Sequence, residues 1–314
     1  MSYYRVCGLT LKTNISFPEL ARSSAQQADC TLTFCRHRGG ATADTKWVYK
    51  NVRPNGKPRL LVGQSETGSV VRFPRLADFV VSPSENDISC FARPKTPKNT
   101  IRHFFLDHVL PAYLSLGRLV LHASAIRVTE KSAIAFLGQS GSGKSTLAAS
   151  FWKEGFEVIA DDCVVVELEN GSPMCVPSYP GLRLWNDSTK AVLSPGPKRS
   201  TLAHYTNKSR FKHPGMEDGF DDRRLALSRI YWLAPPEQGG IGKISIRPIS
   251  GSQGLIQLLQ SSFRLNFKRP KPLIEEFNRL VRIADSKLLY GVNFPRDFCR
   301  IGELTRAILD DIGR

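Results

Sequence analysis

The chain has 314 residues, of which 41% are hydrophobic, and this length supports one large domain or two ordinary ones. It contains no run of about 18 apolar residues, and Met1–Cys7 lacks a signal-peptide pattern, so we expect a cytoplasmic protein with no membrane partner. The seven cysteines are odd in number and form no C-x-x-C pair, which argues against a disulfide framework or a zinc site.

The formal net charge of +16 predicts anionic ligands or partners, because such a field attracts negative charge. A basic surface without a dedicated partner is the alternative. Positive residues concentrate at 197–199 and 207–213, and the chain carries no recognisable nucleic-acid-binding module. We therefore do not expect a nucleic-acid partner.

Residues 1–95 predict a β-rich N-terminal domain, because short apolar or alternating runs are separated by polar turns. The predicted strands lie at 6–13, 30–34, 60–63, 69–73, 79–82 and 88–92, the last two as a hairpin. No catalytic cluster occurs here, so a recognition or assembly role is expected.

Residues 93–98 are typical of a linker, and 99–314 predict a second, α/β domain with a mixed sheet. Helical periodicity over 99–116 predicts a helix that Pro111 would kink. A strand at 118–128 and a tight turn at 129–131 then lead to a second strand at 132–137, so these two strands should be antiparallel.

A glycine-rich loop follows that strand and fits G-x-x-x-x-G-K-[S/T] at every fixed position. A chance glycine-rich turn is the alternative, but strand, loop and helix in succession are the geometry that directs backbone N–H groups and a helix N-terminus at phosphate. Lys144 would reach the β- and γ-phosphates and Ser145 would bind Mg²⁺. The sequence predicts a site for ATP and Mg²⁺ formed by Gly138, Ser140, Gly141, Ser142, Gly143, Lys144, Ser145 and Thr146.

Two adjacent carboxylates, Asp161 and Asp162, interrupt an apolar segment downstream of the loop. In a continuous strand they would face opposite sides, so at least one must lie at a strand end or bend. A surface turn is the alternative. The functional interpretation gives one carboxylate to Mg²⁺ and makes the other the base that accepts a hydroxyl proton.

His122 and Asp187 are further candidate site residues, and for each a structural role is an alternative of equal weight. His122 lies on the strand paired with the loop strand, and could face the phosphates or be a hydrogen-bonded core histidine. Asp187 could reach the metal or belong to a helix N-cap.

Residues 194–222 are polar and basic and predict a mobile loop or lid. Strands are expected at 228–233 and 244–247, and helices at 254–260, 273–283 and 301–312.

The order His122-Ala-Ser-Ala, then the phosphate loop, then Ala160-Asp161-Asp162 resembles the catalytic domain of bacterial HPr kinase/phosphorylase. The segments 246–249 and 263–264 resemble that family's C-terminal signature more loosely. The resemblance implies a P-loop kinase domain of HPr kinase type with a mixed sheet.

Residues 4–9, 15–20, 28–30, 111–116, 121–125 and 179–185 look like HPr-kinase-like proteins found with lasso-peptide biosynthesis genes. This branch phosphorylates the C-terminal serine of a precursor peptide. The resemblance implies that Asp161 is the base, that Asp162 and Asp187 are metal-linked, and that His122 supports the base.

The resulting hypothesis is an ATP-dependent serine kinase that acts on a precursor peptide, with Lys144 and Asp161 as catalytic residues. Cations of the basic lid, Lys208 and Arg210, and Arg247 of the loosely similar segment, are its candidate substrate contacts. A small-molecule or HPr-like protein kinase and a nucleotide-gated peptide-binding ATPase remain alternatives. The oligomeric state is open, a homo-oligomer included.

Overall fold

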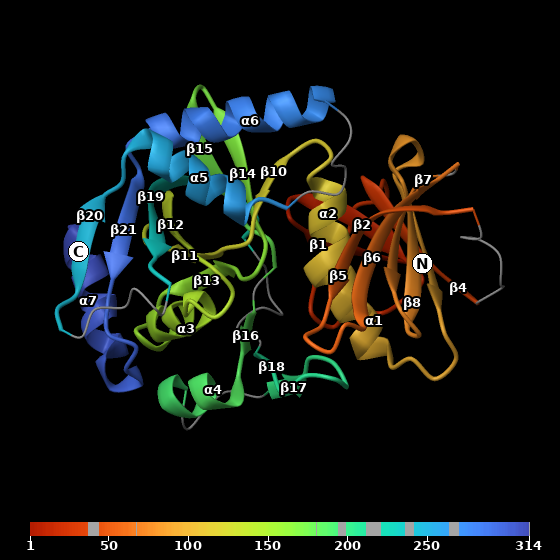
Figure 1. The fold of residues 1–314 in the computed structure, drawn as a ribbon, viewed down its shortest axis with the longest axis horizontal. Coiled ribbons are helices and arrows are strands. Elements are labelled where there is room, and N and C mark those ends of the chain that lie inside the picture. The colour runs from red at the N-terminus through yellow and green to blue at the C-terminus, as the bar shows by residue number, and fades with distance from the viewer. Residues whose placement is uncertain are drawn as a thin grey trace.

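The computed structural model describes residues 1–36, 44–66, 68–179, 181–193, 199–211, 221–235, 242–263 and 270–313. They form a mixed α/β protein with a β-rich N-terminal sheet of nine strands, a second sheet of nine strands and a small sheet of three (Figure 1). In the described part of the chain, no helix combines the length and the apolar composition that a bilayer crossing needs.

The N-terminal sheet has the order β3-β1-β2-β4-β9-β8-β7-β6-β5. Only β2–β4 and β4–β9 pair in parallel. The predicted hairpin is confirmed by antiparallel pairing of β8 with β9 around the 3₁₀ turn Pro83–Glu85. The strands are β1 (Ser2–Val6), β2 (Leu9–Thr13), β3 (Ala21–Arg22), β4 (Cys30–Arg36), β5 (Lys46–Val52), β6 (Pro58–Ser65), β7 (Gly68–Phe73), β8 (Ala77–Ser82) and β9 (Asp87–Ala92).

The helical segment predicted at 99–116 consists of α1 (Lys98–Phe104), a π-helical turn (Phe105–Val109) and α2 (Leu110–Leu114). The irregularity lies directly before Pro111, where the Leu110 N–H bonds the Phe105 carbonyl five residues back. A proline removes one helical donor, and the wide turn accommodates this loss.

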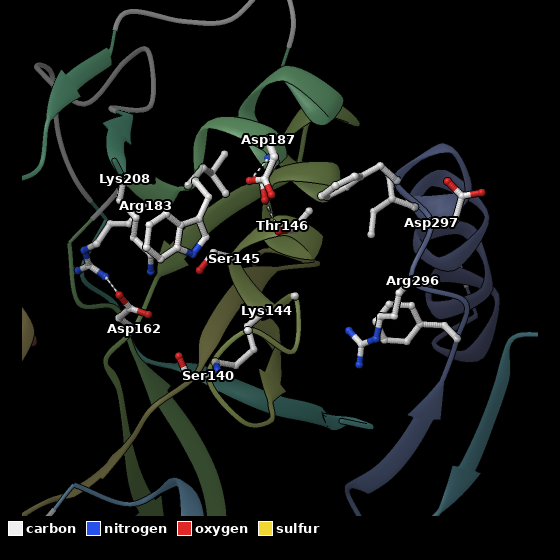
Figure 2. A pocket seen from close by; sticks show the side chains of 18 of the residues that line it. Ser140, Lys144, Ser145, Thr146, Asp162, Arg183, Asp187, Lys208, Arg296 and Asp297 are labelled. Atoms are coloured by element: carbon white, nitrogen blue, oxygen red, sulfur yellow. Dashed lines mark hydrogen bonds and ion pairs between the residues drawn. The ribbon is translucent and has the colours of Figure 1, made fainter. Parts of the chain in front are cut away.

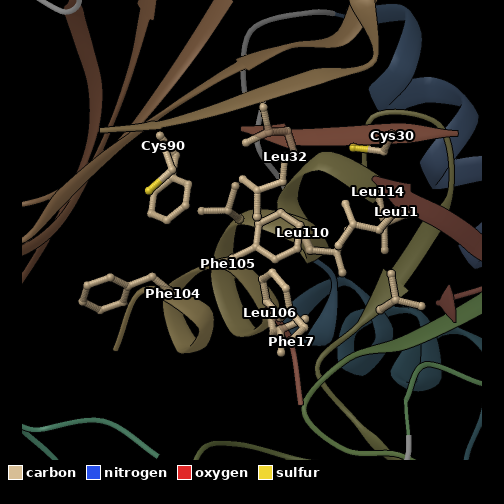
Figure 3. Packing of buried hydrophobic residues seen from close by; sticks show 14 of the residues in the cluster. Leu11, Phe17, Cys30, Leu32, Cys90, Phe104, Phe105, Leu106, Leu110 and Leu114 are labelled. Atoms are coloured by element: carbon tan, nitrogen blue, oxygen red, sulfur yellow. The ribbon is translucent and has the colours of Figure 1, made fainter. Parts of the chain in front are cut away.

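The segment packs its apolar side chains against the N-terminal sheet. Figure 3 shows Phe105, Leu106 and Leu110 pointing toward Leu32 and Phe17 in one buried cluster. The same cluster contains Val120, Val165 and Val176 of the second sheet, and Cys163, which directly precedes β14. The expected domain boundary at 95–99 stays a prediction, and the apolar core runs across it.

The second sheet has the order β10-β14-β15-β19-β12-β11-β13, with β21 beside β19 and β20 beside β21. Its strands are β10 (Leu119–Leu121), β11 (Ser124–Arg127), β12 (Ser132–Leu137), β13 (Glu157–Ala160), β14 (Val164–Glu169), β15 (Ser172–Val176), β19 (Leu225–Leu233), β20 (Ser245–Pro248) and β21 (Leu289–Asn293). The helices are α3 (Lys144–Lys153), α4 (Asn186–Val192), α5 (Gly251–Ser261), α6 (Pro270–Asp285) and α7 (Ile301–Asp311), with a 3₁₀ turn at Phe298–Arg300.

Alternate residues of β12 enter the two apolar layers of this sheet. Ile134 and Phe136 belong to the cluster that includes α3 and α7, whereas Ala133 and Ala135 belong to the cluster that includes α5 and α6. Such alternation is expected for a strand covered on both faces. The helices therefore cover the sheet from both sides (Figure 1). β12 lies inside the sheet, between β19 and β11, and the phosphate loop follows its carboxyl end.

The single strand predicted at 118–128 is wrong in one respect. β10 pairs with β14, whereas β11 pairs with β12 and β13, and the chain breaks at His122–Ala123 between them. There the His122 N–H bonds the Ser261 carbonyl, outside the sheet ladder. The predicted antiparallel pairing with the loop strand is confirmed for β11 and β12.

The loop predicted at 194–222 contains regular structure, whereas its mobility stays a prediction. β18 (Ser209–Phe211) pairs with both β16 (Leu182–Leu184) and β17 (Arg199–Thr201), which gives the order β16-β18-β17. Residues 199–211 are therefore built onto the strand that precedes α4. Residues 194–198 and 212–220 of the prediction lie outside the described residues, as does Arg264.

Candidate active site

The phosphate loop joins β12 to α3, as its sequence context predicts. Gly138, Gly141 and Gly143 have φ angles of 147°, 85° and 94°, in the region that favours glycine. A Cβ atom at Gly138 would lie 2.5 Å from the Ser142 Oγ and 2.9 Å from the Leu233 carbonyl oxygen. The loop is therefore a tight backbone cradle that side chains at these positions would disrupt.

Lys144 is buried at the first position of α3 and reaches back over the loop. Its Nζ donates hydrogen bonds to the carbonyl oxygens of Gly138 at 2.8 Å and Gln139 at 3.1 Å. Burial lowers the pKa of Lys144, an effect opposed by the carboxylates of Asp162 and Asp161. An anion bound at the loop would counter the same desolvation and favour the charged ammonium.

A cavity of about 320 Å³ opens beside the loop (Figure 2). Six loop residues line it: Ser140, Gly141, Gly143, Lys144, Ser145 and Thr146. Gly138 and Ser142 do not line it and support the loop from behind, where Ser142 is fully buried. The cavity is thus bounded on one side by the segment that the motif predicts to bind phosphate.

Asp161 and Asp162 follow the end of β13, which confirms the predicted strand end, but the two side chains have different surroundings. Asp161 is 1% exposed and accepts hydrogen bonds from the Ser124 and Ser145 hydroxyls at 2.7 and 2.8 Å. The Arg183 N–H donates to its other oxygen at 2.9 Å. Burial and the charge of Asp162 raise the pKa of Asp161.

Asp162 instead lines the cavity, on a residue with a left-handed φ of 64°. Its Oδ1 lies 3.4 Å from the His122 Nε2, and its Oδ2 lies 3.1 Å from an Arg183 nitrogen. Although burial raises the pKa of Asp162, the nearby Arg183, His122 and Lys208 hold it well below the usual range. The sequence-based assignment made Asp161 the base, but the carboxylate open to the cavity is Asp162.

Arg183, to which the sequence analysis gave no role, organises this wall of the cavity. It is 1% exposed, and besides both aspartates it binds Asp107 of the π-helical turn at 2.9 Å. Its side chain also donates to the Tyr179 hydroxyl, which in turn donates to Asp107 at 3.1 Å. The sequence did contain a signal for this role, namely an arginine between Leu182 and Leu184 in an apolar segment. A buried guanidinium needs carboxylate partners, so such an arginine indicates acidic residues nearby.

Asp187 lies in the first turn of α4 and lines the same cavity (Figure 2). The predicted alternative role as an N-cap is wrong, since Trp185 is the N-cap residue and makes no side-chain cap. Asp187 accepts only a local hydrogen bond, from the Ser188 N–H at 2.7 Å, among the described residues. Ser188 also accepts a hydrogen bond from Thr146, which ties α4 to the phosphate loop.

The three candidate substrate contacts separate in the structure. Lys208 lines the cavity, with its Nζ 5.2 Å from the centre of the Trp185 ring. Arg210 is buried and pairs with Glu19 at 2.9 Å, and Arg247 lies exposed on β20, so neither lines the cavity. The prediction for Arg210 was wrong because this side chain is buried against Glu19. An arginine in a polar segment gives no indication of a partner so distant in the sequence.

The wall opposite Asp162 contains residues that no motif indicated. Arg296 donates to the carbonyl oxygens of Ser142 and Ala234, and its guanidinium lies 4.1 Å from the centre of the Phe294 ring. Phe298 lines the cavity with 43% of its surface exposed, and Trp185, beside Lys208, lines it with 50% exposed. These aromatic faces suit a planar base, whereas the cations suit phosphate.

No group of three His, Cys, Asp or Glu side chains in the described residues could hold a metal ion. The donor set nevertheless fits Mg²⁺, which usually keeps several waters and binds through one or two carboxylates plus substrate phosphates. Ser145 and Asp161 are joined by a hydrogen bond beside the loop and would supply the protein oxygens.

No family model and no curated protein matches the sequence. Among solved structures, the chain is similar to "Structure of the Hpr(Ser) kinase/phosphatase from Coxiella burnetii", with 14% sequence identity and a TM-score of 0.31. The match covers 62% of this chain and 99% of that chain. A TM-score of this size does not establish a shared fold, so membership of that family stays a prediction.

Proposed function

We propose that the chain is an ATP-dependent serine kinase that transfers the γ-phosphate to a serine hydroxyl of a peptide, the C-terminal serine of a lasso-type precursor peptide. The observation that carries this proposal is one cavity bounded by both the phosphate loop with Lys144 and the carboxylate of Asp162. Phosphoryl transfer needs these two groups together, because positioning and charge stabilisation provide most of its catalysis.

The loop would bind the triphosphate through its backbone N–H groups and Lys144, whose present carbonyl contacts show that its reach includes the loop. Ser145 and Asp161 would hold Mg²⁺, which when bound supplies charge neutralisation on the phosphate oxygens. Asp161 suits this role because it is buried, bonded to Ser145 and closed off from an acceptor hydroxyl.

Asp162 would accept the proton of the serine hydroxyl while the serine oxygen forms its bond to the γ-phosphorus and ADP leaves. His122 and Arg183 contact separate oxygens of this carboxylate and fix its direction. The roles that the family resemblance implied for Asp161 and Asp162 are thus exchanged in our proposal. Lys208, beside Trp185, would face the acceptor peptide.

The test is transfer of γ-labelled phosphate from ATP with Mg²⁺ to synthetic peptides that end in serine, compared with the same peptides ending in alanine. The wild-type chain should label only the serine peptides, and Asp162→Asn should bind ATP without labelling them. Release of label to water alone would favour a nucleotide-gated ATPase. Labelling of a free small hydroxyl compound, but not of peptide, would favour a small-molecule kinase.

A further inference from the structure

The most basic exposed segment of the described chain is the hairpin formed by β5, the first part of β6 and their turn. Residues 46–60, here called the basic hairpin, contain no Asp or Glu. All five of its cations are exposed: Lys46, Lys50, Arg53, Lys57 and Arg59. In the described part of the chain none of these cations forms an ion pair with a carboxylate, so their charges remain available to an anionic partner.

The basic hairpin also exposes apolar surface among these charges. Trp47, Tyr49 and Val52 are 38%, 39% and 50% exposed. The guanidinium of Arg72, from the neighbouring β7, lies 4.7 Å from the centre of the Trp47 ring. Exposed aromatic residues flanked by cations are typical of binding surfaces rather than of inert solvated faces.

Stacked aromatic rings connect the sheet that carries the basic hairpin to the segment that leads into the active cavity. Phe73 of β7, the strand that pairs with β6, stacks on Phe104 of α1 with ring centres 3.7 Å apart. Tyr205 is 37% exposed and stacks on Phe104 with ring centres 5.8 Å apart. These ring contacts place Tyr205 between β7, which pairs with the second strand of the basic hairpin, and residues 206–208.

Those residues continue the surface to the active cavity. Thr206, Asn207 and Lys208 line a second cavity of about 280 Å³ together with Ser200 and Thr201. Lys208 lines both this cavity and the active one. The polar cavity and Lys208 thus lead from the residues after Tyr205 to the active cavity, which Asp162 also lines.

The chemistry of this surface favours an acidic peptide over nucleic acid. Its middle part is lined by hydroxyl and amide side chains, which match the hydrogen-bonding groups of a peptide backbone, and Lys208 is the one cation that lines it. A nucleic-acid backbone would need cations repeated along the whole path. Charge complementarity with the five cations of the basic hairpin requires Asp and Glu in the partner.

We propose that the basic hairpin binds an acidic segment of the acceptor peptide, remote from the serine that enters the active cavity. This inference rests on the proposed function and adds a recognition surface in the N-terminal unit. An acceptor would then be selected by two separate features, a serine hydroxyl at Asp162 and acidic residues at the basic hairpin.

The test uses two fluorescein-labelled peptides of equal length that end in serine, one with a run of Asp and Glu and one with the same run as Asn and Gln. Binding is measured by anisotropy without ATP, for the wild type and for the triple variant Lys50→Gln, Arg53→Gln, Arg59→Gln. A matched control, Lys131→Gln, Lys153→Gln, Arg306→Gln, removes the same charge from exposed positions elsewhere. Melting temperature with and without ATP reports folding and nucleotide binding of each variant.

The wild type should bind the acidic peptide more tightly than the neutral one, with a preference that declines as salt is added. The hairpin variant should bind the acidic peptide about tenfold more weakly, because each of the three lost ion pairs with the peptide is exposed and contributes modestly. The control variant should bind it as tightly as the wild type does. Equal binding of both peptides by the wild type, or unchanged binding by the hairpin variant, would overturn the inference. Tighter competition by a single-stranded DNA oligonucleotide would also overturn it.

The same experiment separates this inference from the proposed function. If the acidic peptide binds through the basic hairpin but receives no label from γ-labelled ATP, the docking surface stands and the kinase proposal fails. If serine peptides are labelled equally well by the wild type and the hairpin variant, whatever their acidic content, the kinase proposal stands and the docking surface fails.

Discussion

The two walls of the active cavity are built in different ways. The phosphate wall is one continuous segment, residues 138–146, whose shape comes from glycine backbone angles and a helix N-terminus. The acceptor wall is assembled from His122, Asp162, Arg183 and Lys208, which come from four separate parts of the chain. Side-chain ion pairs hold it together, and one of them reaches Asp107 beside the N-terminal sheet. The first wall is therefore locally determined, whereas the second depends on the whole fold.

The strongest test of this division is Asp162→Asn. Asparagine tolerates the left-handed backbone at this position and keeps the shape of the side chain, but it cannot accept the proton. We expect phosphoryl transfer to peptide to fall about 10³-fold while ATP binding is retained. Single-turnover transfer of labelled phosphate, with ATP affinity measured separately, checks this.

Asp161→Asn is the matched comparison, because it removes the neighbouring carboxylate. We expect it to raise the Mg²⁺ concentration needed for half-maximal activity, since Asp161 bonds Ser145. A magnesium titration of both variants distinguishes the roles. Loss of transfer in Asp161→Asn with normal magnesium dependence would restore the assignment made from the sequence.

Lys144→Ala tests the phosphate wall. Removing one preorganised cation aimed at the transferring group should lower transfer by about 10²–10³-fold and weaken ATP binding. The acceptor wall does not rest on Lys144, so peptide binding should be unchanged. Near-wild-type turnover of this variant would contradict the nucleotide assignment.

Asp107→Asn tests whether the acceptor wall depends on the N-terminal unit. Asp107 is 6% exposed and binds the buried Arg183, so losing its charge should lower the free energy of unfolding by about 3 kcal/mol. Because Arg183 also holds Asp162, kcat should fall while KM for ATP changes little. The measurements are denaturant unfolding and steady-state kinetics.

Asp78→Asn is the control for that change. Asp78 is 5% exposed and pairs with Arg72 inside the N-terminal sheet, without contact to Arg183. It should lose stability but keep kcat. An equal loss of kcat in both variants would show that general destabilisation, rather than the Asp107–Arg183 pair, controls the acceptor wall.

The smallest predicted effect is a pH dependence of stability centred on His108, next to Asp107. Burial and the charge of His103 lower the pKa of His108 from 6.5 to about 4. The unfolded state therefore takes up a proton at a higher pH than the folded state, so stability is complete above pH 6.5 and declines as the pH falls toward 4. His108 is partly exposed, so screening limits the loss to about 1–2 kcal/mol. Denaturant unfolding across this range should show the decline in the wild type and a flatter profile in His108→Gln.

The sequence was sufficient wherever the determinants are local. The loop residues, the strand end at Asp161 and the antiparallel partner of β12 follow from glycine positions, apolar periodicity and a tight turn. It was insufficient for the sheet of β16, β17 and β18, whose strands have three residues each and in which β16 and β18 pair across more than twenty residues of chain. The pairing of Arg183 with Asp107, and of Arg210 with Glu19, likewise joins distant segments and leaves no periodic signal.

The apolar cluster shared by α2 and the second sheet restricts how such a protein can be recombined. A chimaera that replaces residues 1–95 would separate α1 and α2 from the sheet that buries them, and would expose Phe105 and Leu106. A junction after α2 keeps those helices with their sheet, but the incoming unit must still match Cys163 and Val165 and provide a carboxylate for Arg183. Any exchange of the N-terminal unit, in evolution or in the laboratory, therefore has to preserve these contacts. The acceptor wall and the N-terminal unit can then change only together.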